Sequence, residues 1–210
     1  FHRLSIMDTS EHGMQPFDTN DVRVVCNGEI YNEHLFRTMF ADYPFISHSD
    51  CEVHIPLYRA DGVDMAKKLD AEFAFVLYDK EKGAVLAARD PIGIRPLFYG
   101  ILKENQKMAF ASEAKALHSL CQDVYPSPPG HVYHNGVFTD YSHITDVAEE
   151  LVDLEEIDRR IREGLTTAID KRLMSDVPLG YLLSGGLDSS LVCAIAQKAT
   201  PVPIDTFAIG

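Results

Sequence analysis

From Arg3 to about Asp140, short apolar runs alternate with clusters of turn-forming residues. Residues 22–26, 73–78 and 84–88 are rich in β-branched, aromatic or small apolar side chains, which are typical of strands. Residues 79–83 separate the last two runs and, with the sequence Asp-Lys-Glu-Lys-Gly, are typical of a hairpin loop. The pattern therefore predicts a largely antiparallel sheet in this part of the chain.

A helix is expected to begin near Asp50. Ser49 and Glu52 have the spacing of a capping box, in which two side chains bond reciprocally to backbone amides at a helix start. Pro56 should kink this helix or end it early, because proline lacks a backbone N–H group. The positions that helical periodicity turns toward the core are Val53, Leu57 and Ala60.

The pattern changes after residue 152. Asp153 and Glu156 form a second capping box, and an apolar stripe follows at steps of three and four residues, which predicts a helix of about five turns. The stripe consists of Leu154, Ile157, Ile161, Leu165, Ile169 and Leu173. The following segments indicate a strand (177–183), a Gly-rich turn (184–189), a helix (190–198) and a second strand (204–209). This arrangement implies a parallel sheet with ligands at the carboxyl ends of its strands.

A domain boundary is expected near residues 145–152. Residues 141–176 contain ten acidic and five basic side chains, and the most acidic stretch has the character of a linker. We therefore predict one domain at residues 1–145 and another at residues 152–210. Because residue 1 is Phe and the last residues resemble a strand, we also expect this sequence to be an internal portion of a longer protein.

Composition and charge narrow the classes of function. Hydrophobic residues make up 46% of the chain and charged residues 24%, an ordinary globular balance. The formal net charge of −13 disfavours nucleic acids and anionic membranes as partners. No apolar run approaches the roughly 20 residues that span a bilayer. The four scattered cysteines indicate no disulfide framework, so we expect a cytoplasmic protein.

The Gly-rich segment from Ser184 to Ser190 is the strongest candidate for chemistry. It follows a predicted strand and opens a predicted helix, where backbone amides and the helix dipole favour a phosphate group. It is not a Walker A loop, because it has no lysine for a γ-phosphate. The alternative is a simple turn in which Ser and Asp side chains cap the helix.

Asn27 and Gly28 allow two interpretations. An Asn-Gly pair after an apolar strand is the commonest signal for a two-residue hairpin. The same pair could supply a side-chain amide and a backbone amide to an oxyanion, where losing one donor typically costs about 3–4 kcal/mol.

Charged residues near this pair suggest an amino-acid ligand. Arg3 could hold an α-carboxylate, while Glu29 and Asp50 hold the ammonium, although each could equally be an ordinary surface charge. Arg89, Asp90 and Arg95 could touch the substrate, but we favour a buried Asp–Arg pair that braces the loop between strands. A zinc site at His48, Cys51 and His54 is disfavoured, because no fourth ligand is apparent, and we expect no resident metal site of this kind.

Nine strings occur in an order that marks a family. They are HRLSIMD (residues 2–8), NGEIYN (27–32), SDCE (49–52), FAFVLYD (73–79), RDPIGIRPLFY (89–99), ASEAKAL (111–117), PPG (128–130), SDVPLGYLLSGGLDSS (175–190) and TFAIG (206–210). Over its whole length the chain resembles the glutamine-hydrolysing asparagine synthetases. This resemblance implies an α/β and α+β protein: an N-terminal-nucleophile αββα sandwich, the type 2 glutamine amidotransferase domain, followed by the start of a parallel-sheet adenine-nucleotide α-hydrolase (PP-loop) domain.

The resemblance also implies two sets of site residues. The glutamine pocket would consist of Arg3, Leu4, Ile6, Met7, Asn27, Gly28, Glu29 and Asp50, with Asn27 and Gly28 as the oxyanion donors. ATP would contact Leu183, Ser184, Gly185, Gly186, Asp188, Ser189 and Ile209. The family's nucleophile is an amino-terminal cysteine followed by Arg-Gly-Pro-Asp, and we expect both to lie outside these residues.

The implied activity is a ligase reaction. Glutamine would supply ammonia, ATP with Mg²⁺ would convert aspartate to a β-aspartyl adenylate, and ammonia would displace AMP to give asparagine. The partners would be glutamine, aspartate, ATP and a second copy of the chain. Alternatives are a β-lactam-forming synthetase with the same second domain, a phosphoribosyl amidotransferase, which would lack the SGGLDSS string, and a catalytically silent interaction module.

Overall fold

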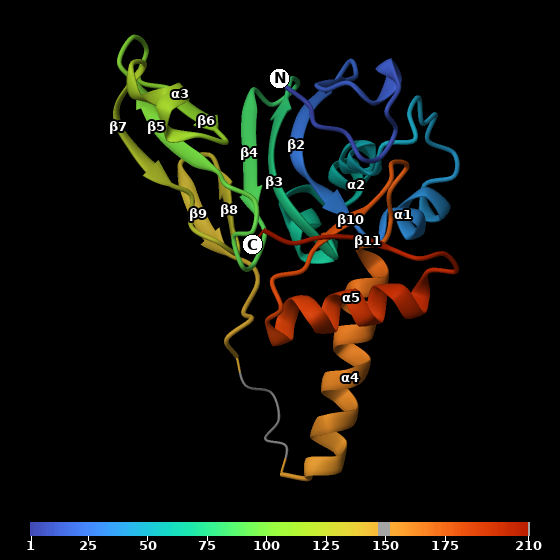
Figure 1. Cartoon of the computed structure of the whole chain (residues 1–210). Coiled ribbons are helices and arrows are strands. Elements are labelled where there is room, and N and C mark those ends of the chain that lie inside the picture. Colours follow the sequence, from blue (N-terminus) through green and yellow to red (C-terminus); the bar gives the residue numbers. More distant parts are fainter. Residues whose placement is uncertain (147–151, 210) are drawn as a thin grey trace. The chain divides into compact units, whose positions relative to one another are not determined.

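The computed structural model describes residues 1–146 and 152–209, and the chain divides into two compact units (Figure 1). The first unit comprises Phe1–Leu4 and Ser10–Asp146, and the second comprises Ser5–Thr9 and Val147–Gly210. Residues 147–151, which are part of the acidic stretch predicted as a linker, lie outside the described residues. The domain limits drawn from the sequence therefore stay a prediction.

A six-stranded antiparallel sheet forms the centre of the first unit, as the alternating pattern predicted (Figure 1). Its strands, in spatial order, are β1 (Phe17–Asp18), β2 (Val22–Ile30), β3 (Ala71–Asp79), β4 (Ala84–Arg89), β8 (His131–His134) and β9 (Val137–Asp140). The predicted hairpin between β3 and β4 is confirmed, because Asp79 pairs with Ala84 across its loop.

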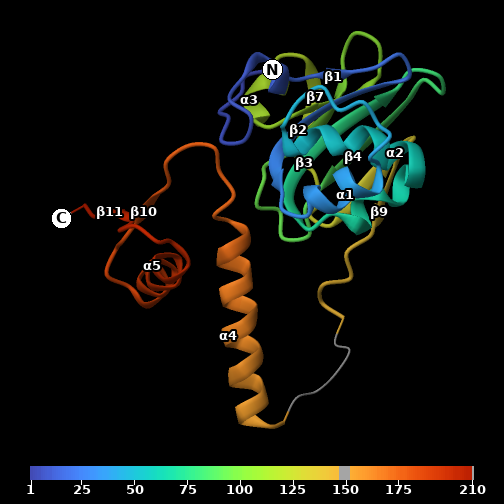
Figure 2. The same ribbon diagram turned by 90° about the vertical axis from the view of Figure 1, so that its right-hand side faces the viewer.

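Helices cover one face of this sheet (Figure 2). Alternate β2 and β3 residues, such as Val24 and Phe75, turn toward them and are fully buried with Leu57 of α2 in the main hydrophobic core. The helical segments of this unit's first half are η1 (Glu11–Gly13), α1 (Glu33–Met39), η2 (Asp50–Val53), α2 (His54–Asp61) and η3 (Gly62–Lys68).

A second, three-stranded sheet packs on the opposite face. Its spatial order is β6 (Met108–Ala111), β5 (Phe98–Leu102) and β7 (Cys121–Pro126), and the short helix α3 (Ala114–His118) lies against it. Ala74 and Tyr133 of the large sheet share a smaller apolar core with Leu97 and Phe110. The layers therefore run helix, sheet, sheet, helix, which confirms the predicted αββα arrangement.

The helix predicted near Asp50 exists, but its start differs from a capping box. The Ser49 side chain caps no amide, and both Glu52 carboxylate oxygens turn back to the chain before the helix, accepting from the amides of Ile46 (2.9 Å) and Ser47 (2.8 Å). Pro56 neither kinks nor ends α2, because it lies in the first turn, where its missing N–H has no helical acceptor to lose.

The inward positions predicted for this helix are partly correct. Val53 and Leu57 are fully buried, but Ala60 is exposed. The helix begins as a 3-10 turn, which advances by 3.0 residues per turn rather than 3.6 and therefore rotates the later positions away from the predicted face.

The second unit confirms the predicted strand, turn, helix and strand. Strands β10 (Gly180–Leu182) and β11 (Asp205–Phe207) are parallel, and α5 (Leu187–Ala199) connects them. Both strands are shorter than the predicted runs. Among residues 1–146 and 152–209, no helix has both the length and the apolar character needed to cross a membrane.

The long helix α4 (Leu154–Lys171) is also confirmed. Asp153 caps it by accepting from the Glu155 amide at 3.0 Å, whereas Glu156 bonds to Arg159 and Arg160 instead of completing a capping box. Along the predicted apolar stripe, Ile169 is buried, while Leu154 and Ile161 are exposed.

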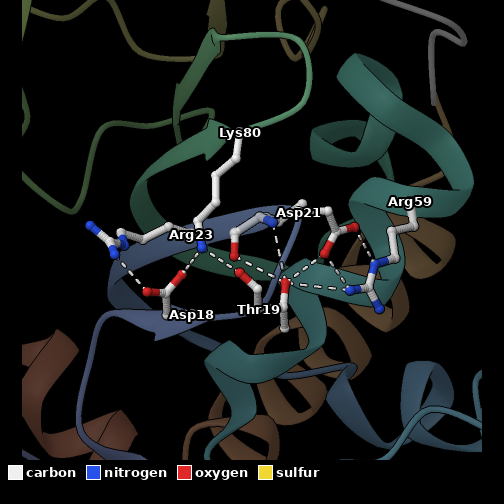
Figure 3. Close-up of polar contacts among 7 residues, drawn as sticks. Asp18, Thr19, Asp21, Arg23, Arg59 and Lys80 are labelled. Carbon is white, nitrogen blue, oxygen red and sulfur yellow. Dashed lines mark hydrogen bonds and ion pairs between the residues drawn. The ribbon is translucent and has the colours of Figure 1, made fainter.

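Polar side chains on the surface of the first unit link three segments (Figure 3). The Arg59 guanidinium of α2 donates to both Asp21 carboxylate oxygens, at 2.7 and 2.9 Å, while Lys80 from the β3–β4 loop contacts Asp18. Thr19 joins the two halves by donating to Asp21 at 2.7 Å. This network fixes the β1–β2 turn against α2 and the neighbouring loop.

Candidate amino-acid and nucleotide sites

Strand β2 passes straight through Asn27 and Gly28, so the hairpin interpretation of this pair is wrong. Asn27 pairs with Ala74 and Gly28 with Phe73, in register with the rest of β3. A Cβ atom on Gly28 would lie 2.3 Å from the Glu72 carbonyl oxygen. Glycine is therefore needed here for close contact between two strands and not for a turn.

The backbone of β2 leaves one amide uncapped beside Asn27. The Cys26 amide donates to Gln15 Oε1 at 2.5 Å, and the Ile30 amide donates to Asp50 Oδ2 at 2.6 Å. Alternate residues of an antiparallel strand direct their N–H groups to the same side, so the Gly28 amide lies between these two and faces away from β3. Strand β1 pairs only as far as Val24, so no strand among the described residues lies opposite Gly28 on this side.

The Asn27 side chain supplies a second donor. It is half-buried and makes no hydrogen bond to any residue that the structure describes. Its amide and the Gly28 N–H thus form an adjacent pair of donors held on a rigid strand, which is the arrangement that stabilises the oxyanion of a tetrahedral intermediate.

Glu29 and Asp50 form a crowded pair of carboxyl groups next to these donors. Burial, followed by the nearby Asp50 charge, raises the pKa of Glu29 to about 8. Burial also raises the pKa of Asp50, against the opposing effect of the Ile30 amide bond. Glu29 Oε2 is buried and has no hydrogen-bond partner among the described residues. An ammonium group would supply both the missing donors and the missing positive charge.

The other four residues that the family resemblance places in the glutamine pocket lie in surroundings that differ from one another. Arg3 is half-buried in the first unit, and Leu4 is 96% exposed. Ile6 and Met7 belong to the second unit, where the Ile6 carbonyl accepts from the Asp176 amide at 2.8 Å. Of the eight residues, the structure brings four together, on β2 and η2: Asn27, Gly28, Glu29 and Asp50.

The loop after β4 is braced, but not by the expected ion pair. The buried Asp90 carboxylate accepts from the backbone amides of Ile92, Gly93, Ile94 and Arg95 at 2.6–3.1 Å. Arg89 donates in turn to carbonyl groups of the same loop and of Ser127. The expectation of an Asp–Arg pair was wrong because both side chains satisfy buried backbone groups instead.

This loop places Arg95 near the site, a residue for which the sequence left substrate contact only as the less favoured alternative. Arg95 Nη2 pairs with Glu72 Oε1 at 2.7 Å, and Glu72 lies directly opposite Glu29 in the β2–β3 register. The local pattern carries no signal for this contact, because it depends on strand register and on the folded loop.

Two buried cysteines lie next to each other near β2. The contact with Cys51 and the neighbouring His54 lower the pKa of Cys26, while the same contact raises the pKa of Cys51. His54 Nδ1 lies 2.8 Å from the Cys51 carbonyl. In the part of the chain that the structure describes, no three His, Cys, Asp or Glu side chains are arranged to hold a metal ion.

The Gly-rich loop lies between β10 and α5. The Leu183 amide donates to the Phe207 carbonyl at 2.8 Å, which continues the sheet up to the loop. Gly185 has φ +82°, a conformation that favours glycine, and Gly186 is the N-cap of α5 without a side-chain cap. The alternative in which Ser and Asp side chains cap the helix is therefore wrong.

The polar groups of this loop remain accessible. Ser184 Oγ and Ser189 Oγ are 3.0 Å apart, and Asp188 is exposed in the first turn of α5. Leu183 is half-buried, whereas Ile209 is fully exposed. The uncapped first amides of α5 and the two serine hydroxyls provide hydrogen-bond donors that suit a phosphate group.

Comparisons with known proteins identify sequences that are similar to this chain. The asparagine synthase family matches residues 160–210. The chain is 42% identical over 205 residues to a probable glutamine-hydrolysing asparagine synthetase of Schizosaccharomyces pombe, covering 94% of this chain and 37% of that protein. It is 44% identical over 204 residues to asparagine synthetase 1 of Saccharomyces cerevisiae, with 94% and 36% covered. The chain thus spans little more than a third of these relatives' length.

Solved structures agree on the fold alone. A glutamine phosphoribosylpyrophosphate amidotransferase from B. subtilis aligns with a TM-score of 0.53 and 17% identity, covering 94% of this chain and 49% of that chain. The glutamine amidotransferase domain family matches residues 1–144, more than half of the chain. The chain therefore belongs to the glutamine amidotransferase domain family.

Proposed function

We propose that the first unit releases ammonia from glutamine and that the second unit uses ATP to make asparagine from aspartate. The observation that carries the proposal is the donor pair at Asn27 and Gly28 beside the unpartnered carboxylate oxygen of Glu29. A ligand with a carbonyl group at one end and an ammonium group at the other fits both features, and glutamine has both.

The first half-reaction assigns a separate role to each group. The thiolate of the amino-terminal cysteine, implied by the family, attacks the side-chain amide carbon, and Asn27 and Gly28 stabilise the resulting oxyanion. Ammonia leaves as the glutamyl thioester forms, and water hydrolyses the thioester to glutamate. Glu29 and Asp50 hold the α-ammonium group, while Arg3 pairs with the α-carboxylate. Leu4 completes the pocket of the first unit in this proposal.

The second half-reaction takes place at the Gly-rich loop. The ATP phosphates lie against Ser184, Gly185, Gly186 and Ser189, and the adenosine lies near Leu183 and Ile209. The aspartate side-chain carboxylate attacks the α-phosphate, pyrophosphate leaves, and ammonia then displaces AMP from the β-aspartyl adenylate. Mg²⁺ would be held by phosphate oxygens and Asp188, where it offsets the charge of the leaving pyrophosphate.

The proposal includes a homodimer, as the family resemblance implies, and a cytoplasmic location, as the lack of a disulfide framework suggests. Sedimentation of the full-length gene product tests the dimer, and cell fractionation tests the location.

Pyrophosphate release by the full-length gene product tests the activity. We expect release to require ATP and aspartate, and to proceed with either glutamine or ammonium chloride as the nitrogen source. Asparagine and glutamate should then accumulate in equal amounts during the glutamine-supported reaction. Pyrophosphate release that is independent of aspartate would refute the assigned acceptor, and failure to form glutamate would refute the role of the first unit.

A further inference from the structure

Three acidic side chains crowd one end of the β2–β3 pair. Glu29 and Glu72 are directly opposed in register and lie on the same face, and Asp50 approaches from η2. Like charges directly opposite each other destabilise a sheet. An arrangement of this kind persists in a folded protein only when other groups offset the charge.

Arg95 is the cation that faces this cluster. Its Nη2 donates to Glu72 Oε1 at 2.7 Å, and the pair is largely buried. Its Nε atom is buried and has no hydrogen-bond partner among the described residues. The same is true of Glu29 Oε2. The guanidinium is thus close enough to Glu29 to act on its charge, while its hydrogen bond goes to Glu72.

The loop fixes the guanidinium in this place. The Arg95 amide donates to Asp90 Oδ2 at 3.0 Å, and the Arg95 carbonyl accepts from Arg89 Nε at 2.7 Å. Both backbone groups of Arg95 are therefore held by buried side chains. Its position is a property of the loop and not of a mobile surface side chain.

We propose that Arg95, held by Glu72, is a positioning residue of the glutamine pocket: it offsets the negative charge around Glu29 and leaves Glu29 Oε2 open to the substrate's α-ammonium group. The inference rests on the proposed function of the first unit. Glu72 has a distinct part in it, because its bond to Arg95 keeps the guanidinium from pairing directly with Glu29 and occupying the ammonium position.

Four charged or titratable groups act on Glu29. Asp50, Cys26 and Glu72 raise its pKa and Arg95 lowers it. Removing Arg95 should therefore leave less of the Glu29 carboxylate ionised near neutral pH, and removing the Glu72 charge should leave more. Substitutions of Arg95 and Glu72 are therefore expected to shift the pKa of Glu29 in opposite directions. A general loosening of the packing around this ion pair would not produce opposite shifts.

The test is the pH dependence of glutaminase kinetics in the full-length gene product, from about pH 6.5 to 9.5. Arg95→Met should raise KM for glutamine about tenfold at pH 7, which is the effect expected if the pKa of Glu29 rises by about one unit. The kcat of this variant should stay within about twofold of the wild-type value. The ratio of its KM to the wild-type KM should shrink as the pH rises. Arg95→Lys should restore part of the affinity.

Glu72→Gln is the second variant and keeps an acceptor for Arg95. It should move the pH dependence of KM to lower pH, in the direction opposite to Arg95→Met. This variant therefore tests the proposal even where Arg95→Met does not fold. Arg23→Met removes another Arg–carboxylate pair of β2, at 2.6 Å from Asp18, and should leave the profile unchanged. Equal changes in KM at every pH, or shifts of the same sign for both partners, would overturn the inference. Wild-type protein without glutaminase activity would instead refute the proposed function.

Discussion

At the scale of single residues, the site depends on groups that the fold leaves unsatisfied. The amides of Cys26 and Ile30 are capped by side chains, whereas the Gly28 amide between them faces away from β3 and has no hydrogen-bond partner among the described residues. Asn27 has no described hydrogen-bond partner either. Buried or half-buried polar groups are usually satisfied within the protein, so adjacent exceptions indicate where a ligand binds.

The Asn27 side chain should matter for catalysis and little for stability. Asn27→Ala removes an oxyanion donor, so kcat for glutamine hydrolysis should fall about 10²- to 10³-fold. The unfolding temperature should stay the same, because no internal hydrogen bond is lost. Asn20→Ala, at an exposed position, is the control and should leave kcat unchanged. A large drop in the unfolding temperature of Asn27→Ala would show that the residue has a structural role instead.

Glu29 should reduce stability at alkaline pH. Its pKa rises from 4.5 to about 8 on folding, so the folded state binds more protons than the unfolded chain between these values. The stabilisation that Glu29 provides is full below the lower pKa and is lost as the pH rises through the upper one. The side chain of a Glu29→Gln variant does not titrate, so the variant lacks this pH-dependent contribution to stability.

Glu29→Gln should therefore gain stability relative to wild type as the pH rises from about 5 to 9, by about 1–3 kcal/mol once solvent screening is allowed for. Thermal unfolding of both proteins at the two pH values measures this difference. A difference that stays constant with pH would contradict the assigned pKa.

At the scale of elements, the loop after β4 holds the residues that complete the site. Asp90→Asn replaces one carboxylate oxygen with an NH₂ group that cannot accept, so buried amides of residues 92–95 lose their partners. We expect a loss of about 3–5 kcal/mol. Thermal unfolding and hydrogen exchange of these four amides measure it. Asp123→Asn, at an exposed position of β7, should have no effect. Unchanged amide protection in Asp90→Asn would exclude the carboxylate as the brace of the loop.

The surface network in Figure 3 should contribute much less. Arg59 is 40% exposed, so Arg59→Met should cost about 1 kcal/mol at low salt and less at high salt. The Arg59 bond lowers the pKa of Asp21, so this stabilisation is present above the ordinary Asp pKa and disappears as the pH falls through the lowered one. Urea unfolding at neutral and acid pH measures it. Lys67→Met removes a more exposed ion pair with Asp64 and should leave the free energy of unfolding unchanged. A loss of stability in Arg59→Met that is independent of salt would contradict an ionic origin.

The success of sequence-based prediction also differs between elements. Periodicity predicted α4 and the β3–β4 hairpin correctly, because each depends on patterns within a few residues. It failed at Asn27 and Gly28, where pairing with β3 overrides the local preference for a turn. It also failed at Glu52, whose carboxylate satisfies amides before the helix instead of capping it.

The candidate site could be predicted in part for the same reason. Asn27, Gly28, Glu29 and Asp50 were found because their motifs are contiguous in the sequence. The contact between Arg95 and Glu72 was missed because it joins residues 23 positions apart through a loop whose shape depends on Asp90. Local sequence carries little information on contacts of this kind.

At the scale of the whole molecule, the two units are proposed to perform separable half-reactions. The Gly-rich loop belongs to the second unit and the donor pair belongs to the first. A substitution in one site should therefore leave the chemistry of the other intact, provided that each unit folds.

Asp188→Asn is the sharpest test of this separation. Asp188 is exposed and no described contact depends on it, so the substitution should preserve the fold while it removes a negative charge from the Gly-rich loop. If Asp188 helps to hold Mg²⁺ on the phosphates as proposed, its loss should lower aspartate-dependent pyrophosphate release about 10²-fold or more, because the metal charge would stabilise the leaving group. Glutamine hydrolysis should stay within about twofold of wild type, since its donors and carboxylates lie elsewhere. Asp170→Asn, an exposed position of α4, is the matched control for both assays. Equal loss of the two activities would mean that the half-reactions are not separable, and full retention of pyrophosphate release would remove Asp188 from the nucleotide site.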